Sequence, residues 1–206
     1  EQIRKLEQRW AEREGQALYA LMERAGAALC SYARHHWPQS HHWWIFVGSG
    51  NNGGDGYVLA RLARRLGLEP LVIAARAPGL LRGDARRAAD EWLAVGGEVM
   101  MADALEGASL PSPDLVIDAL LGTGVQLPLS LPMTKIVSTI NGLNAPVLAV
   151  DLPSGLNADT GRAMGALVHA TRTLSFIGIK QGMLTADGVD GVGQLDWDPL
   201  GVVPEA

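Results

Sequence analysis

The chain has 206 residues, of which 48% are hydrophobic and 19% are charged. Since one domain typically holds about 150 residues, this length and composition predict a single globular domain with a sizeable core. A formal net charge of -5 disfavours a nucleic-acid partner, because a phosphate backbone repels it. The single cysteine, Cys30, excludes an internal disulfide bond and a cysteine-based zinc site, and no apolar run approaches the ~20 residues that span a membrane. We therefore expect a cytoplasmic protein that acts on neither membranes nor nucleic acids.

Hydrophobic periodicity predicts alternating helices and strands along the chain. Apolar positions at helical spacing run from residue 3 to about residue 34, with interruptions near Gly15 and Gly26, and predict one long helix or two shorter ones. The elements expected after it, in chain order, are strand 42–47, helix 54–66, strand 70–75, helix 83–95, strands 98–101 and 115–119, helix 133–141, and strands 147–150 and 171–177. Because these strands are uniformly apolar and joined through helices or long loops, we expect an α/β fold, a three-layer αβα sandwich with a mostly parallel central sheet. We expect one domain over residues 1–206, with residues 199–206 beginning a linker.

The most informative loop follows the first expected strand and holds G-x-G-x-x-G at Gly48, Gly50 and Gly53. Between a strand and a helix, this spacing is typical of dinucleotide binding, because the glycines let backbone N–H groups approach a phosphate at the helix N-terminus. A tight turn that needs glycine only for packing is the alternative. The acidic residue that dinucleotide-binding dehydrogenases place about 20 positions further on is absent, and Arg76 occupies that region. An ordinary NAD-dependent dehydrogenase is therefore disfavoured.

Asp118 and Asp151 lie at or next to the ends of two further strands, where each could also simply cap a turn. The carboxyl ends of parallel strands meet at one edge of the sheet, so we expect these loops to converge there. Oxygens of Asn52, Asp118 and Ser154 form a donor set suited to a hard cation, and one carboxylate with two neutral oxygens favours an ion of low charge. Lys180 follows the strand 171–177 and is interpreted either as a surface lysine or as a functional one.

The segments GSGNNGGDG, IDALLGTG and AVDLPSGLNADTG, followed by residues 173–176 and Lys180, resemble the NAD(P)H-hydrate epimerase family, or YjeF N-terminal domain. The resemblance covers nearly the whole chain. It implies a Rossmann-like, usually dimeric domain that interconverts the R and S forms of NADH and NADPH hydrated at C6 of the nicotinamide ring. It is greatest for the N-terminal half of bacterial bifunctional enzymes, which implies a fused ADP- or ATP-dependent dehydratase domain.

The resemblance also implies roles for particular residues. Potassium would be held by Asn52, Asp118 and Ser154, the same oxygens that suggest a cation site. Two departures from the family pattern are Ser49, where proline is common, and the loop after Gly124, which lacks a frequent arginine and leaves the NADH or NADPH preference open. The substrate contacts implied are Asn51, Asn52, Gly53, Gly54, Asp55, Gly122, Thr123, Gly124, Val125, Gln126, Leu127, Pro128 and Asp151.

The chemistry at C6 requires a group that protonates the departing hydroxyl and later assists the return of water. Asp151 is the first candidate for this catalytic role and Lys180 the second. Two other classes stay open at this point. One is a non-catalytic nucleotide-binding or scaffold module of the same fold, and the other is an NAD(P)-dependent oxidoreductase.

Overall fold

A computed structural model describes residues 2–124 and 127–202, so the expected substrate contacts Val125 and Gln126 lie outside the described residues. Its centre is a seven-stranded sheet in the order β3-β2-β1-β4-β5-β6-β7, and every strand pairing in it is parallel. The strands are β1 (His42–Val47), β2 (Glu69–Ala74), β3 (Val99–Met101), β4 (Leu115–Ala119), β5 (Val147–Val150), β6 (Arg172–Phe176) and β7 (Gln194–Asp198). The predicted three-layer α/β fold is confirmed.

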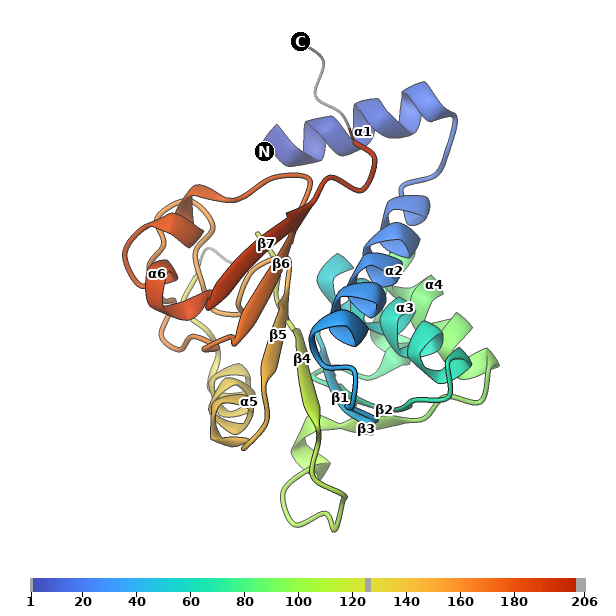
Figure 1. Cartoon of the computed structure of the whole chain (residues 1–206), viewed down its shortest axis with the longest axis vertical. Helices are drawn as coiled ribbons and strands as arrows, with labels where there is room; N and C mark the ends of the chain where they lie inside the picture. The colour runs from blue at the N-terminus through green and yellow to red at the C-terminus, as the bar shows by residue number, and fades with distance from the viewer. Residues whose placement is uncertain (1, 125–126, 203–206) are drawn as a thin grey trace.

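Helices cover both faces of the sheet (Figure 1). They are α1 (Gln2–Glu14), α2 (Tyr19–His36), α3 (Asn51–Arg65), α4 (Gly83–Ala94), α5 (Leu131–Gly142) and α6 (Gly188–Gly191), with short 3-10 turns at Pro78–Leu80, Ala102–Ala104 and Gln181–Leu184. In Figure 1, α2, α3 and α4 lie on one side of the strands, and α5 and α6 lie on the other. None of the described helices is long and apolar enough to cross a membrane.

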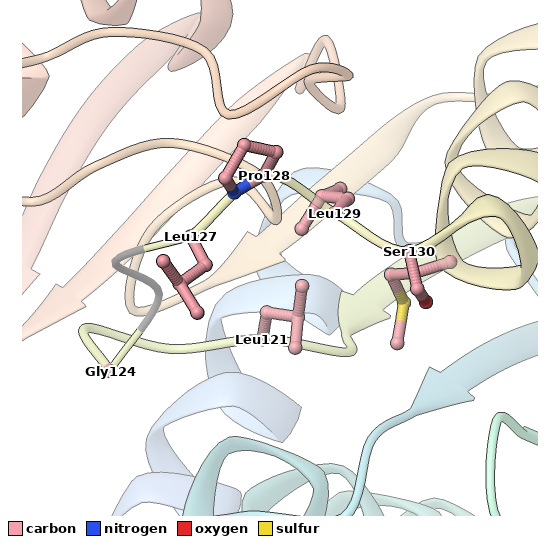
Figure 2. A pocket seen from close by; sticks show the side chains of 7 residues that line it. Leu121, Gly124, Leu127, Pro128, Leu129 and Ser130 are labelled. Carbon is pink, nitrogen blue, oxygen red and sulfur yellow. The ribbon is translucent and has the colours of Figure 1, made fainter.

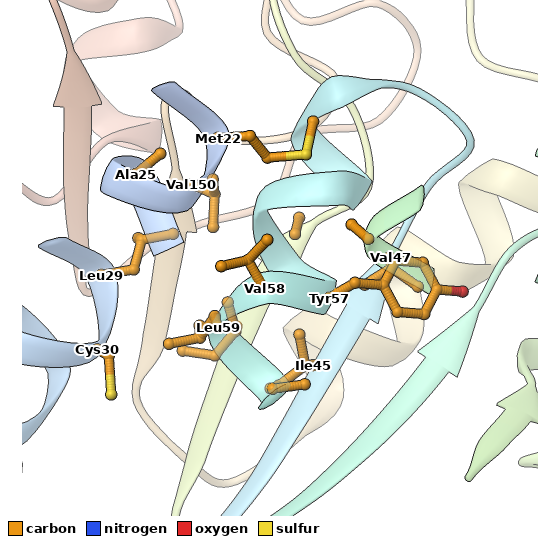
Figure 3. Close-up of a cluster of buried hydrophobic side chains, with 14 of the residues drawn as sticks. Met22, Ala25, Leu29, Cys30, Ile45, Val47, Tyr57, Val58, Leu59 and Val150 are labelled. Atoms are coloured by element: carbon orange, nitrogen blue, oxygen red, sulfur yellow. The ribbon is translucent and has the colours of Figure 1, made fainter. Parts of the chain in front are cut away.

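The largest apolar core lies between the sheet and the helices α2, α3 and α4. Figure 3 shows part of this core, where α2 and α3 pack together over β1. Close packing is possible because glycines face neighbouring side chains: a Cβ added at Gly26 would lie 2.4 Å from Val58, and one at Gly54 would lie 2.5 Å from Met22. The core therefore fixes α3, which follows the glycine-rich loop, against α2.

The first expected helical stretch is two helices. Gly15, with a φ of +59°, separates α1 from α2 in a conformation that favours glycine. The expected interruption at Gly26 is wrong, since that residue lies inside α2, where its missing side chain allows the contact with Val58. Helix α1 is held by Trp10, which is buried, and Arg24 lies over the Trp10 ring at 4.7 Å while donating a hydrogen bond to the Leu200 carbonyl oxygen.

Two differences from the sequence-based elements affect the site. Helix α3 begins at Asn51, three residues before the expected start, so the amides of Asn51 and Asn52 belong to its first turn instead of to a loop. Strand β7 was not expected. Its sequence alternates polar and apolar residues, and its side chains are only partly buried, as is usual for the strand at the edge of a sheet.

Candidate functional site

Four neighbouring strands bring the expected site residues together. Strands β1, β4, β5 and β6 are adjacent in the sheet, and Asn52, Asp118, Asp151 and Lys180 lie at or beyond their carboxyl ends. The strand order reverses between β1 and β4, since the chain first proceeds outward through β2 and β3 and then returns to the other side of β1. Ligands of open α/β sheets bind at such a reversal. This edge of the sheet is therefore the candidate site.

The glycines of the first loop have two different functions. A Cβ added at Gly48 would lie 1.7 Å from the Leu120 carbonyl oxygen, and one at Gly53 would lie 2.2 Å from the Gly48 carbonyl oxygen, so both are required by close backbone contacts inside the protein. No atom of the described residues lies within 4 Å of the Cβ position of Gly50. Packing alone accounts for Gly48 and Gly53, and only Gly50 leaves open space where a ligand could approach the start of α3.

Asp118 is the centre of a buried hydrogen-bond network at the end of β4. Its carboxylate accepts hydrogen bonds from the Ser154 backbone N–H at 2.7 Å, from Ser154 Oγ at 2.6 Å and from the Leu120 N–H at 3.3 Å. Loss of water around the fully buried carboxyl group raises the pKa of Asp118 to about 6, although all three hydrogen bonds oppose this shift. A positive ion beside Asp118 would offset the cost of burying its charge.

Asn52 completes the expected cation-binding set. Its Nδ2 donates a hydrogen bond of 3.0 Å to the Leu121 carbonyl oxygen, and the Leu121 N–H donates one of 2.9 Å to Ser154 Oγ. The Leu121 backbone therefore links Asn52 to Ser154, whose Oγ is bonded to Asp118. The Asn52 Oδ1 atom is buried and has no hydrogen-bond partner among the described residues. An unpaired amide oxygen, on a side chain linked through Leu121 to a hydroxyl and a carboxylate, fits an oxygen-coordinated cation.

Asp151 and Lys180 form an ion pair between the loops that follow β5 and β6. Asp151 Oδ1 also accepts a hydrogen bond of 3.0 Å from the Phe176 N–H, and Asp151 adopts a left-handed backbone with a φ of +67°. Lys180 is buried, and its Nζ donates two further hydrogen bonds of 3.0 Å, to Ser175 Oγ and to the Phe176 carbonyl oxygen. Every donor of the ammonium group therefore has a partner, which fixes the Asp151 carboxylate in position.

Asp55 lies on α3, and the charges of Asp151 and Lys180 shift the pKa of its carboxyl group. Loss of water around the carboxyl group, and then the negative charges of Asp151 and Glu7, raise the pKa of Asp55 well above its usual range, while the Lys180 ammonium opposes the shift. Asp55 as a whole residue is only partly buried. Glu7 belongs to α1, and the sequence motifs did not indicate that this helix takes part in the site.

The expected substrate loop lies next to the cation-binding set. A Cβ at Gly122 would be 3.5 Å from the Asn52 Cβ, while Thr123 is exposed. Further along, Gly124, Leu127 and Pro128 border an open hollow of about 440 Å³ between this loop and α5, shown in Figure 2. The other lining residues are Leu121, Leu129, Ser130 and Met133. None of the described residues that line the hollow is a candidate catalytic residue, so we expect it to hold a part of a ligand that is remote from the reacting atoms.

The fold and site define a Rossmann-like α/β domain with a composite site where its strand order reverses. Residues 18–182 match the family described as YjeF-related protein N-terminus, and the chain belongs to this family. The crystal structure of yeast ynu0, YNL200c, superimposes with a TM-score of 0.77 and 22% sequence identity, over 95% of this chain and 84% of that one, which supports the same fold.

Two curated relatives carry functional names. The NAD(P)H-hydrate epimerase of Bordetella bronchiseptica is 38% identical over 210 residues, which cover 99% of this chain and 87% of the relative. The bifunctional NAD(P)H-hydrate repair enzyme Nnr of Escherichia coli (strain K12) is 41% identical over 200 residues, which cover 97% of this chain and 38% of that enzyme. The chain thus spans well under half the length of the bifunctional relative.

Proposed function

We propose that this domain interconverts the R and S hydrates of NADH and NADPH at C6 of the nicotinamide ring. The observation that carries the proposal is the arrangement at the edge of the sheet, where a buried set of three oxygen-bearing side chains and the Asp151–Lys180 ion pair both lie at the carboxyl ends of neighbouring strands. A relative of nearly the same length as this chain is named NAD(P)H-hydrate epimerase, which supports this reading over a non-catalytic module. Arg76, just beyond β2, stands where NAD-dependent dehydrogenases carry an acidic residue and disfavours an oxidoreductase.

Different residues around the site contact different parts of the substrate. In the first turn of α3, the backbone N–H groups of Asn51, Asn52 and Gly53 have no partner within the helix and bind the pyrophosphate, while the Gly54 N–H donates to the Gly50 carbonyl oxygen at 3.1 Å. The loop that begins at Gly122 and continues to Pro128 contacts the remainder of the dinucleotide. Asp151 and Asp55 contact the hydrated ring.

Epimerisation at C6 proceeds through a positively charged ring carbon. The lone pair on the ring nitrogen assists departure of the C6 hydroxyl, and water returns on the opposite face. In this proposal the Asp151 carboxylate, held in place by Lys180 and by the Phe176 N–H, stabilises that positive charge. Catalysis also needs an acid that gives a proton to the hydroxyl and recovers one from water.

The proposed function predicts faster interconversion of the two hydrates by the purified domain. A mixture of R and S NADH hydrate is incubated with residues 1–206, and the two forms are followed by chromatography against their spontaneous interconversion. A rate above the spontaneous one by about a hundredfold or more is expected from acid–base and electrostatic catalysis. No acceleration by folded protein that still binds the hydrates contradicts the proposal and favours a binding module.

We propose that potassium occupies the site formed by Asn52, Asp118 and Ser154. The bound ion would supply a fixed positive charge that orients these loops. The same assay is expected to run several-fold faster in potassium than in sodium at equal ionic strength, because Asn52 Oδ1 and the Asp118 carboxylate form an oxygen site of low charge. Asn52→Leu, which removes the amide oxygen, is expected to abolish the difference between the two salts. Equal rates in both salts with the unaltered protein contradict the potassium site.

Three further proposals concern the oligomeric state of the domain, a fused second domain and the cellular compartment. We propose that the domain works as a homodimer, with the exposed edge of β7 and Trp197, which is 54% exposed, as part of the contact. We also propose a fused ADP- or ATP-dependent dehydratase domain beyond residue 199, and the longer relative named bifunctional supports a second domain. A free, buried Cys30 suits a reducing compartment such as the cytoplasm. Light scattering of the purified domain tests the dimer.

A further inference from the structure

The turn that follows β6 surrounds the ammonium group of Lys180. Lys180 Nζ donates hydrogen bonds of 3.0 Å to Ser175 Oγ and to the Phe176 carbonyl oxygen, and it forms the ion pair with Asp151 Oδ1. Ser175 is fully buried, and Lys180 is only 6% exposed. Burial of an ammonium group is costly unless its hydrogens have acceptors. Here a hydroxyl, a backbone carbonyl and a carboxylate supply three acceptors for its three hydrogens.

An unusual backbone turn places one of these acceptors. The Gly178 N–H donates a hydrogen bond of 2.6 Å to the Phe176 carbonyl oxygen, and Ile177 between them has a φ of +65°. These two features define the rare form of the γ-turn, and a positive φ is especially unfavourable for a β-branched residue. Phe176 contributes its carbonyl oxygen to Lys180 and its N–H to Asp151 Oδ1. Backbone strain of this kind is concentrated at functional sites.

The hydrogen of the Ser175 hydroxyl points to the backbone. Ser175 Oγ lies 3.0 Å from the Gly178 carbonyl oxygen, and because a carbonyl oxygen can only accept, the hydroxyl must donate to it. Toward Lys180 the same Oγ atom can then only accept. The Phe176 carbonyl oxygen is also only an acceptor. The three contacts of Nζ therefore use all three hydrogens of a charged ammonium group, whereas a neutral amine would lack one donor.

We propose that Ser175 is a positioning residue of the candidate site. Together with the turn at residues 176–178, it holds Lys180 as a fixed ammonium group, and Lys180 in turn orients the Asp151 carboxylate. The Lys180 ammonium and the Phe176 N–H both bind Asp151 Oδ1, while Oδ2 accepts no hydrogen bond from residues 2–124 and 127–202 and is left for a ligand. This inference rests on the proposed function, and it gives Lys180 a constant charge instead of a role in proton transfer.

Ser175→Ala and Thr173→Val form a matched pair of variants on β6. Both residues are fully buried and lie two positions apart, hence on the same face of the strand, and each substitution removes one hydroxyl. The Thr173 hydroxyl donates to the Val192 carbonyl oxygen at 2.7 Å, just as Ser175 donates to that of Gly178. Of these two hydroxyls, only that of Ser175 contacts Lys180. Thermal unfolding is therefore expected to shift by a similar amount in both variants.

Only Ser175→Ala is expected to slow the interconversion of the hydrates. Its kcat is expected to fall about 10- to 100-fold, because the Lys180 ammonium loses one of its three hydrogen bonds, each of which involves a charged group. Calorimetry is expected to show that NADH binding persists, since the fully buried Ser175 cannot contact the ligand. In Thr173→Val, kcat is expected to equal that of the unaltered protein.

NMR of isotope-labelled lysine observes the ammonium group without any substrate. The chain has three lysines, and replacing Lys5 and Lys135 by arginine leaves Lys180 alone. A buried ammonium group with three hydrogen bonds exchanges its hydrogens slowly with water, so a signal from nitrogen with three attached hydrogens is expected at neutral pH. In this background the signal is expected to persist in Thr173→Val and to broaden or disappear in Ser175→Ala.

The outcomes separate this inference from the proposed function. An unchanged kcat in Ser175→Ala, or an equal loss in both β6 variants, overturns the positioning role. A Lys180 signal that shows two hydrogens, that is absent with Ser175 in place, or that is unaffected by Ser175→Ala overturns the fixed ammonium group. If folded, unaltered protein does not accelerate interconversion, the proposed function fails, and the NMR comparison still tests the ammonium group by itself.

Discussion

Replacing Asp151 by asparagine is expected to lower kcat for hydrate interconversion at least about a hundredfold while NADH binding is retained, because the negative charge beside the positively charged ring is lost. Asparagine is the suitable substitution here. It tolerates the left-handed backbone found at this position, where φ is +67°, and its amide oxygen can still accept the Phe176 N–H. The buried Lys180 ammonium keeps its hydrogen bonds to Ser175 Oγ and to the Phe176 carbonyl oxygen.

The matched control is Asp159→Asn, an equal change of charge at an exposed position in the same segment. Its turnover is expected to equal that of the unaltered protein, and thermal unfolding checks that both variants are folded. Chromatography of the R and S hydrates gives the rates, and calorimetry with NADH gives the affinity. Near-normal epimerisation by Asp151→Asn would remove Asp151 from the mechanism. A loss of binding together with turnover would instead assign it to substrate binding.

Gly48→Ala is expected to cause the largest loss of stability, lowering the free energy of unfolding by about 3 kcal/mol or more. The added Cβ would lie 1.7 Å from the Leu120 carbonyl oxygen, which is backbone and cannot rotate away. The Gly48 N–H is also bonded to the Ala119 carbonyl oxygen at 3.0 Å, which ties the two chain segments together. If the segments around Gly48 and Leu120 move apart, the chain after β4 is displaced. Leu121 lies in that part of the chain, and its backbone joins Asn52 to Ser154.

Gly50→Ala provides the comparison within the same motif. Its Cβ would meet no atom of the part of the chain that the structure describes within 4 Å, and its φ of -101° is acceptable for any residue, so a change within about 1 kcal/mol is expected. Urea unfolding followed by circular dichroism measures both variants. Equal stability of Gly48→Ala and Gly50→Ala would contradict the close backbone contact. If Gly50→Ala is stable but binds NADH weakly, the open space beside Gly50 belongs to the ligand.

Short-range burial patterns were sufficient to predict much of the fold. Strands β4 and β5 were predicted to the residue, at Leu115–Ala119 and Val147–Val150, because central parallel strands are buried on both faces and read as unbroken apolar runs. The edge strand β7 (Gln194–Asp198) is not predicted, because its alternating polar and apolar residues, which are partly exposed, give a sequence pattern similar to that of a loop. Helix α3 begins three residues before its predicted start, because the glycine-rich sequence from Asn51 to Gly54 is typical of a loop whereas tertiary packing holds it in a helix.

What the sequence by itself determined is the set of residues capable of chemistry and their position after strands. Tertiary structure alone decided which of them meet. Sheet order joins Asn52 to Leu121, 69 residues further along the chain, and pairs Asp151 with Lys180, 29 residues away. The buried, unpaired Asn52 Oδ1 and the effect of Glu7 on Asp55 have no local sequence pattern. The physical reason is that periodicity reports the burial of each element, whereas hydrogen bonds and charge interactions depend on distances that only the packed sheet and helices create.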